Sequence, residues 1–258
     1  MNGEALFQQA MQHFTQQNTG AANQLLMQAA QRGHLMATLY LAEQYFRQRP
    51  SDAYQFLRQQ WDAGVKGTLH RLVTLKAFFD QQRLTSADFG LLHQEALAGH
   101  VESMLILLNL SQVHEGHLFY VSLLEEFAPG LLKSLGCTRM IEQANGQLVD
   151  SLSSSQLLDT ICVQWHMRST HEPMVHIHNC NVKLYKNVVS ELFCDYLILR
   201  LKAHMKPSMV HDPVTGEGIQ NDVRTSYIAH ITPEHLDWFT LELDMIIESL
   251  SGTSRSHF

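Results

Sequence analysis

The chain has 258 residues, of which 45% are hydrophobic and 17% are charged. This composition is that of a folded globular protein with room for two domains, and it excludes extensive disorder. The formal net charge is −7, and the segments before and after residue 170 are both acidic, with 11 basic against 14 acidic residues and 7 against 11. We therefore expect no nucleic-acid partner.

The first residues carry neither a basic segment nor an apolar core, so they do not resemble a signal peptide. No apolar run approaches the roughly 18 residues of a membrane span. The four cysteines, Cys137, Cys162, Cys180 and Cys194, form no Cys-x-x-Cys pair, which argues against a zinc ribbon or a thioredoxin-type motif. We expect a cytoplasmic protein with no membrane partner, in which Cys180 and Cys194 are buried thiols.

Residues 1–125 are expected to form pairs of helices. Fifteen of the first 82 residues are Gln and Pro50 is the only proline among them, which is a composition that permits helix. Three segments align on Gly33, Gly64 and Gly99, which lie 31 and 35 residues apart between amphipathic stretches. A glycine in this place is typical of the turn of a helical hairpin, where it adopts a positive φ at low cost.

Two helix starts support these pairs. Ser51 and Asp52 follow Pro50, and Thr85-Ser86-Ala87-Asp88 offers a capping hydroxyl followed by an early acid. Three or more helix pairs, each burying its apolar face against the next, would form an α-helical solenoid.

The first aligned segment has Ala29 and Ala30 before its glycine and a small residue, Ala37, four positions after it. This pattern resembles Sel1-like repeats, which are related to the tetratricopeptide (TPR-like) repeat. The second segment departs from it, because Thr68 stands at the position of Ala37 and the Leu-Gly of the family's second helix is absent. The resemblance implies a peptide or protein partner on the repeats; the alternative is that the helices only support a neighbouring domain.

Residues 126–172 are expected to form a junction between two domains. Pro129-Gly130 and Asn145-Gly146 are turn signals, and Ser151-Leu152-Ser153-Ser154-Ser155 is typical of a linker or a helix cap. The sequence leaves open whether this junction belongs to the first or the second domain, and it leaves open the register of the repeats.

Residues 173–258 change in character. The alternation from Val175 to Val182 predicts a strand, and Ser190 caps an apolar helix from Glu191 to about Met205, before Pro207. A second extended run covers residues 222–231, and Thr232 with Pro233 predicts the start of a last helix. This order of elements predicts an α+β domain.

Four motifs in this segment follow one another in a characteristic order. They are Asn187-Val188-Val189-Ser190-Glu191-Leu192-Phe193-Cys194-Asp195-Tyr196-Leu197-Ile198, Lys206-Pro207-Ser208-Met209-Val210, Thr215-Gly216 and Val223-Arg224-Thr225-Ser226. Together they resemble the N-terminal portion of a 2-oxoglutarate/Fe(II) dioxygenase domain of the prolyl 4-hydroxylase type. The resemblance implies an incomplete double-stranded β-helix, or jelly roll, so the fold class expected for the whole chain is mainly α: a helical-repeat solenoid followed by a partial α+β domain.

The residues of these motifs that the resemblance singles out are Pro207, Ser208, Arg224, Thr225 and Ser226. It implies that Arg224, Thr225 and Ser226 line the approach to the active site or brace the barrel. The alternative for Arg224 is an ion pair at a strand edge with Asp222 or Glu217.

The family holds its iron with a His-x-Asp motif and a distant His, and a basic residue pairs with 2-oxoglutarate. The chain ends at Phe258, before the strands that carry these groups, so we expect no metal ligands and no catalytic residues here. Fe(II), 2-oxoglutarate and ascorbate are implied only for a complete domain. His235-Leu236-Asp237 falls in a predicted helix, where residues two apart point about 200° apart. His176 and His178 share a strand face, but no third ligand has a diagnostic spacing.

Two functions stay open. The first is an oxidoreductase for peptidyl hydroxylation, truncated and inactive as given, whose repeats present the polypeptide. The second is a non-catalytic helical-repeat adaptor that acts through protein–protein interaction. An interrupted gene or a shortened fragment explains the missing strands more simply than a natural inactive relative. A barrel cut after its first strands leaves sheet edges and an apolar helix face uncovered, which predicts a dimer, low stability or docking on the solenoid.

Overall fold

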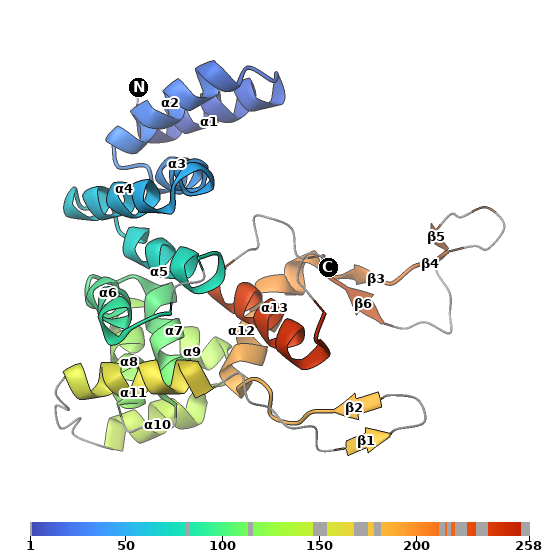
Figure 1. Cartoon of the computed structure of the whole chain (residues 1–258). Coiled ribbons are helices and arrows are strands. Elements are labelled where there is room, and N and C mark those ends of the chain that lie inside the picture. Colours follow the sequence, from blue (N-terminus) through green and yellow to red (C-terminus); the bar gives the residue numbers. More distant parts are fainter. Residues whose placement is uncertain are drawn as a thin grey trace. The chain divides into compact units, whose positions relative to one another are not determined.

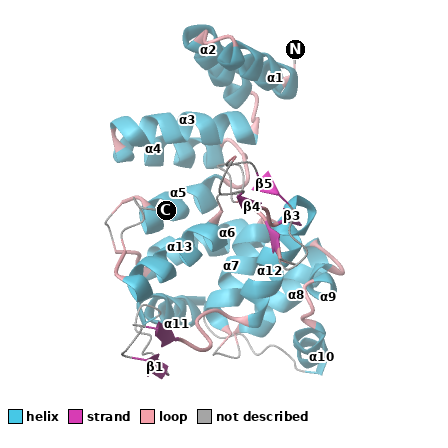
Figure 2. Cartoon of the chain, turned by 90° about the vertical axis from the view of Figure 1, so that its right-hand side faces the viewer, coloured by secondary structure: helices cyan, strands magenta, loops and turns pink. Residues whose placement is uncertain are grey.

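The computed structural model describes residues 2–80, 83–112, 116–146, 154–167, 175–177, 182–211, 215, 218–219, 226–230 and 237–253 (Figure 1). The chain divides into two compact units. The first unit comprises Met1–Pro129 and Met140–Arg168, and the second comprises Gly130–Arg139 and Ser169–Phe258. The described residues are mainly helical, as Figure 2 shows, which confirms the expected mainly α class. No helix in the described ranges is long and apolar enough to cross a membrane.

The first unit is a succession of short helices. They are α1 (Gly3–Thr15), α2 (Thr19–Gln31), α3 (Leu35–Gln48), α4 (Pro50–Asp62), α5 (Thr68–Phe78), α6 (Ser86–Leu97), α7 (Val101–Ser111), α8 (His117–Phe127) and α11 (Ser154–Met167). Helix α10 (Thr138–Gly146) crosses the boundary between the units. Each helix from α1 to α8 packs against the next one in the chain, and α3 also contacts α5.

The three aligned glycines lie where the sequence predicts them, between consecutive helices. Gly33, Gly64 and Gly99 have φ values of 76°, 91° and 90°, in the left-handed region that side chains disfavour. The helix starts also agree: Pro50 is the first residue of α4, and Thr85 forms a capping box with Asp88 at the start of α6.

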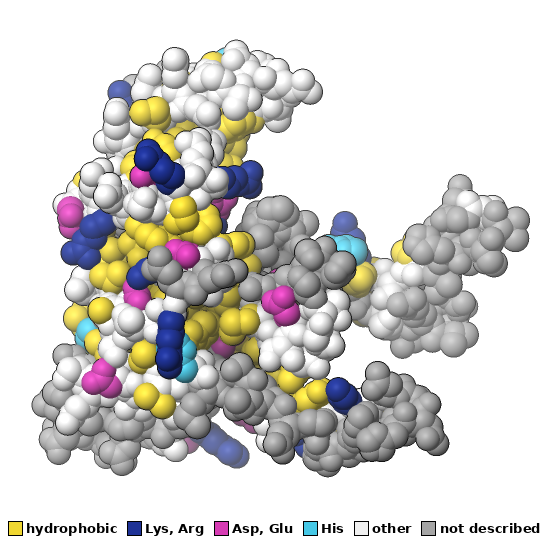
Figure 3. Space-filling model, in the orientation of Figure 1, with side chains coloured by type: hydrophobic (Ala, Val, Ile, Leu, Met, Phe, Trp, Pro, Cys, Tyr) yellow, Lys and Arg dark blue, Asp and Glu magenta, His cyan; other side chains and the backbone are white. Residues whose placement is uncertain are grey.

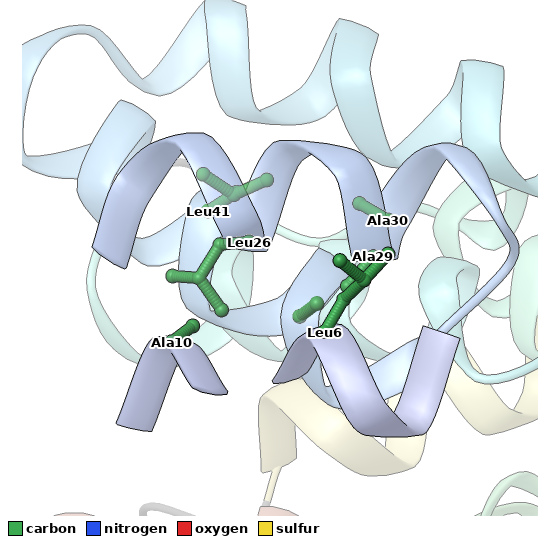
Figure 4. Close-up of a cluster of buried hydrophobic side chains, with 7 residues drawn as sticks. Leu6, Ala10, Leu26, Ala29, Ala30 and Leu41 are labelled. Atoms are coloured by element: carbon green, nitrogen blue, oxygen red, sulfur yellow. The ribbon is translucent and has the colours of Figure 1, made fainter. Parts of the chain in front are cut away.

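Alanines set the spacing of the first three helices. The core there consists of seven buried residues, drawn in Figure 4: Leu6, Ala10, Leu26, Ala29, Ala30, Ala37 and Leu41. Four of the seven are alanines with small side chains, so the helices approach closely and the leucines fill the space between them. The alanines that carry the resemblance to Sel1-like repeats are thus packing residues.

Helix α11 packs on α6 and α7 of the first unit. The ring of Trp165 lies 5.8 Å from Phe78 and 6.5 Å from Phe89, between centroids. Ser86 Oγ donates a hydrogen bond to Asp159, and Leu157 lies so close to Gly116 that a Cβ there would stand 2.4 Å from it. Residues 154–167, which the sequence places in the junction, therefore contribute to the core of the first unit.

The second unit combines helices with very short strands. Its elements are α9 (Leu131–Ser134), β1 (Val175–Ile177), β2 (Val182–Leu184), α12 (Glu191–Leu201), the 3-10 helix Lys202–His204, β3 (Lys206–Pro207), β4 (Val210–His211), β5 (Gly218–Ile219), β6 (Tyr227–Ile228) and α13 (Trp238–Ser251). Within the described ranges the strands form separate antiparallel pairs, β1–β2, β3–β6 and β4–β5. Phe239 joins α13 to α12, with its ring 4.2 Å from Tyr196 and 5.3 Å from Phe193.

Four predictions for this unit are wrong in detail. The strand predicted from Val175 to Val182 is instead two strands, because Ile177 pairs with Val182 in the antiparallel β1–β2 ladder. The helix from Glu191 ends at Leu201 rather than near Met205, and a 3-10 turn follows. Its N-cap is correct, since Ser190 Oγ accepts a hydrogen bond from the Phe193 amide (3.1 Å).

The last helix begins at Trp238, not at Thr232 and Pro233, because Asp237 forms a two-way capping box with Thr240. Residues 231–236, with the predicted cap, lie outside the described ranges. Cys194 is exposed on α12 rather than buried, while Cys180 lies outside the described residues.

Candidate functional site

Three of the five motif residues of the second unit come together at the β3–β6 pair. Pro207 pairs with Tyr227 in this ladder. The Ser208 amide donates to the Ser226 carbonyl (2.9 Å), and Ser226 Oγ donates to Ser208 Oγ (3.0 Å). Ser208 is buried, and both bonds close the same residue pair, so they hold two separate motifs in register. Arg224 and Thr225 lie outside the described residues, as do Asp222 and Glu217.

Asp237, the acid of the His-x-Asp sequence, is buried and engaged as a helix cap. Its Oδ1 accepts a hydrogen bond from the Thr240 amide (3.0 Å), and its Oδ2 accepts one from the Tyr196 hydroxyl (2.7 Å). Arg200 Nε lies 3.8 Å from the same Oδ2. The carboxylate thus orders the start of α13 and ties it to α12.

The other histidines considered as ligands cannot be placed. His178 and His235 lie outside the described residues, and for His176 only the backbone is described, in β1. Among the residues that are described, no three His, Cys, Asp or Glu side chains gather in a way that could hold a metal ion.

The first unit contains a buried acid–base cluster that the sequence analysis did not identify. Helix α5 begins after Gly67, which is its N-cap and has no side chain to accept from the free amides of the first turn. Glu95, from the last turn of α6, takes over this role. Its Oε1 accepts from the amides of Gly67 (2.8 Å) and Leu69 (2.9 Å), and its Oε2 accepts from the amide of His70 (2.9 Å).

Two effects act in opposite directions on the pKa of the Glu95 carboxylate. Glu95 is fully buried, and burial raises its pKa, while the three backbone hydrogen bonds favour the charged form and lower it. The placement is favourable for an anion, because the N-terminus of a helix carries partial positive charge.

Two histidines complete the cluster. His100 is the N-cap of α7, and its Nδ1 accepts from the Ser103 amide (3.3 Å) while lying 2.9 Å from Ser103 Oγ. The rings of His70 and His100 lie 5.3 Å apart, and His70 Nε2 is 3.1 Å from Glu102 Oε1. Burial lowers the pKa of His100 to about 4, and it holds the pKa of His70 well below its usual range.

A sequence signal for this cluster exists. Gly33-His34 and Gly99-His100 are the same dipeptide at two of the three aligned glycines, and His34 Nδ1 likewise caps α3 by accepting from the Ala37 amide (3.2 Å). The middle copy lacks the histidine, and Glu95 lies on the buried face of α6, three residues after Leu92. Two features together indicate that Glu95 caps a helix. It is an acidic residue on an apolar helix face, and the middle aligned segment lacks the capping histidine that the other two segments have.

A second surface of the first unit exposes apolar side chains. We define the α1–α3 face by Phe7, Met36 and Tyr40. The ring of Phe7 lies 6.0 Å from that of Tyr40, and Met36 and Tyr40 are 47% and 42% exposed. The ring of His34 stacks on Phe7 at 4.7 Å. More broadly, Figure 3 shows hydrophobic side chains reaching the surface over α3, α4 and α5.

Pairs of an acidic side chain with a His or Arg connect the odd-numbered helices. Glu4 of α1 bonds His34 of α3 (2.8 Å), Arg71 of α5 bonds Glu43 of α3, and His70 of α5 meets Glu102 of α7. Each pair joins one helix to the next odd-numbered one, so the same kind of link recurs along the unit.

Comparison with protein-family models, with curated proteins and with solved structures finds no match to this chain. The Sel1-like and dioxygenase resemblances therefore stay predictions that rest on their motifs.

Proposed function

We propose that the first unit is a helical-repeat solenoid and that the chain is a binding or adaptor protein, which holds a peptide or protein segment on the α1–α3 face. The observation that carries this proposal is a group of apolar side chains on α1 and α3, in which Met36 and Tyr40 are exposed and the partly buried Phe7 lies beside Tyr40. Methionine and aromatic residues are the types enriched where proteins bind partners.

The repeat character of the unit has independent support. Helices follow each other in contact from α1 to α8, and left-handed glycines recur at Gly33, Gly64 and Gly99. The pairs of an acidic side chain with a His or Arg on odd-numbered helices recur in the same way. A unit in which each element contacts mainly its neighbours is the arrangement of a solenoid, and such folds present an extended binding surface.

The chemistry of the face indicates how a partner would be held. Met36 and Tyr40 are four residues apart, so they lie on the same side of α3. Glu43 follows Tyr40 by three residues on α3 and pairs with Arg71, and Glu4 precedes Phe7 by three residues on α1 and bonds His34. An apolar centre with a polar rim fits a segment that inserts one or two apolar anchors.

The experiment selects peptides from a displayed random library on the full chain and measures their affinity for variants. We expect the double variant Met36→Ala/Tyr40→Ala to bind at least about tenfold more weakly, because interface anchors of this type carry most of the binding energy. Met27→Ala is a matched control, since Met27 is also 47% exposed but lies on α2. Equal losses in the control and the double variant, or no loss in either, would contradict the proposal.

We also propose that residues 173–258 are related to the N-terminal portion of a dioxygenase domain of the prolyl 4-hydroxylase type. This second proposal is favoured by the β3–β6 pair, which joins Ser208 and Ser226 from two motifs that follow each other in that family. The described residues do not fit Fe(II), because Asp237 is engaged by Tyr196 and Thr240 and no other group of ligands gathers there. We assign the pair a bracing role and derive no hydroxylation step.

The test of this second proposal is succinate release by the purified chain with Fe(II), 2-oxoglutarate, ascorbate and the selected peptides. We expect release at the level of a no-enzyme control. Turnover above that level would contradict the assignment of the chain as a binding protein.

A further inference from the structure

One carboxylate caps α5 and lies beside the cap of α7 at the place where α5, α6 and α7 meet. We call this place the α5–α7 joint and define it by Gly67, His70, Glu95, His100 and Ser103. Glu95 accepts from the first amides of α5, and its Oε2 also lies 3.5 Å from Nδ1 of His100, the residue that caps α7. The cap of α5, Glu95, and the cap of α7, His100, therefore meet through one pair of atoms, Oε2 and Nδ1.

The hydrogen bonds define the protonation state of His100. Its Nδ1 accepts from the Ser103 amide, and a ring nitrogen that accepts carries no proton, so the ring is neutral with its hydrogen on Nε2. In this state the contact between Nδ1 and Glu95 Oε2 joins two acceptors and contributes no bond. A proton on Nδ1 changes the contacts of His100 with both Ser103 and Glu95. The ring can no longer accept from the Ser103 amide to cap α7, and it becomes a donor to Glu95.

We propose that the α5–α7 joint is an acid-sensitive switch, in which a proton on His100 Nδ1 releases the start of α7 and draws Glu95 away from the start of α5. The bistable element is this exchange of hydrogen-bond partners. The closed state has two capped helices, and the opened state has a His100–Glu95 ion pair and two uncapped starts.

The surrounding charges decide how readily the switch operates. Lys66, whose Nζ lies beside Gly99, opposes a positive His100, and Glu95 of α6, 3.5 Å from His100 Nδ1, favours it. The ring of His70 on α5 lies 5.3 Å from that of His100, but burial holds the pKa of His70 well below its usual range, so this ring is neutral. Arg71 of α5 and Glu102 of α7 act on His70, and Arg71 is itself paired with Glu43 of α3.

The linkage between proton binding and opening of the joint gives the direction of the pH dependence. The pKa of His100 is about 4 in the closed joint and 6.5 in an open chain, so acid favours opening as the pH falls from 6.5 to about 4. The equilibrium constant for opening should rise by up to about tenfold per pH unit in that window. Glu95 acts in the opposite sense, because its raised pKa favours the closed state as the pH falls.

The test is amide hydrogen exchange in the full chain between pH 7 and pH 4.5, corrected for the intrinsic pH dependence of exchange. We expect protection of the Leu69 and Ser103 amides to fall together as the pH is lowered. His100→Asn keeps a good capping acceptor but cannot titrate, so it should flatten this dependence while protection at pH 7 is retained. His34→Asn is the matched control, because His34 caps α3 in the same way outside the joint, and it should leave the dependence unchanged.

A wild-type pH dependence in His100→Asn would overturn the proposal, and so would its loss in His34→Asn. A second measurement needs no variant: the ring protons of His100 in the wild-type chain should titrate near pH 4, with the Ser103 amide shift following the same curve. A midpoint at or above 6.5, or a Ser103 amide that does not follow, would overturn it.

Discussion

The two units differ in how far apart in the sequence their stabilising contacts lie. In the first unit the helix ends are fixed by residues next to them, such as Gly33 after α2, Pro50 at the start of α4 and the Thr85 capping box. In the second unit the strands are two or three residues long; β1–β2 and β4–β5 join consecutive strands, whereas β3 pairs with the more distant β6. Local signals therefore define most helix ends of the first unit, whereas the second unit also depends on pairing between distant segments.

The largest effect is expected where the first unit departs from this local pattern. Replacing Glu95 by Ala leaves the buried amides of Gly67, Leu69 and His70 without their acceptor, and unsatisfied buried donors are costly. We expect a loss of about 3 kcal/mol in the free energy of unfolding, measured by urea denaturation at pH 7.

Two further variants test this expected loss of stability, and both should lose less. Glu95→Gln keeps one carbonyl acceptor and should lose less, whereas Glu126→Ala removes an exposed acid from the last turn of α8 and should change stability very little. If Glu95→Ala were as stable as Glu126→Ala, the capping role of the carboxylate would be wrong.

A smaller effect is expected at one of the turn glycines. Gly99 has a φ of 90°, and a Cβ there would lie 2.8 Å from the ring of Phe127. Gly99→Ala should cost about 2 kcal/mol, from the left-handed backbone and the contact with that ring.

Gly20→Ala is the matched control for Gly99→Ala, and its effect on stability should have the opposite sign. Gly20 lies within α2 with nothing near its Cβ position, so alanine there should stabilise by about 0.5 kcal/mol. Thermal unfolding of both variants measures the difference, and equal midpoints would remove the special role given to the turn glycine.

The smallest destabilisation is expected in the second unit. Asp237→Ala removes the cap of α13 and the acceptor of the Tyr196 hydroxyl, with an expected cost of about 1–2 kcal/mol. The measurement is hydrogen exchange of the α13 amides, where protection should fall while that of α1 to α4 is kept. An equal fall in both regions would show that the two units unfold together.

The same contrast explains what the sequence predicts and what it does not. The turn glycines, the start of α4 and the Ser190 cap depend on neighbouring residues and are confirmed. The start of α13 was misplaced because Thr232-Pro233 and Asp237 are both good start signals, and the tertiary bond to Tyr196 favours the second. The single strand predicted from Val175 to Val182 failed because alternation does not show where a chain reverses.

The candidate sites follow the same rule. Ser208 and Ser226 were singled out by motif, but their mutual hydrogen bonds could not be read from residues 18 positions apart. Glu95 was missed because its partners, at the start of α5, lie 25 to 28 residues before it. A carboxylate on an apolar helix face is visible in the sequence, yet the amides it serves become visible only once the helices are packed.

The most direct test of the proposed binding function is a chemical-shift map of the full chain with a selected peptide. The account predicts that the largest shifts fall on Phe7, Met36 and Tyr40 and their neighbours on α1 and α3, with Met27 on α2 unaffected. Shifts concentrated in α12, α13 or the β3–β6 pair would contradict it, because the partner would then be held by the second unit.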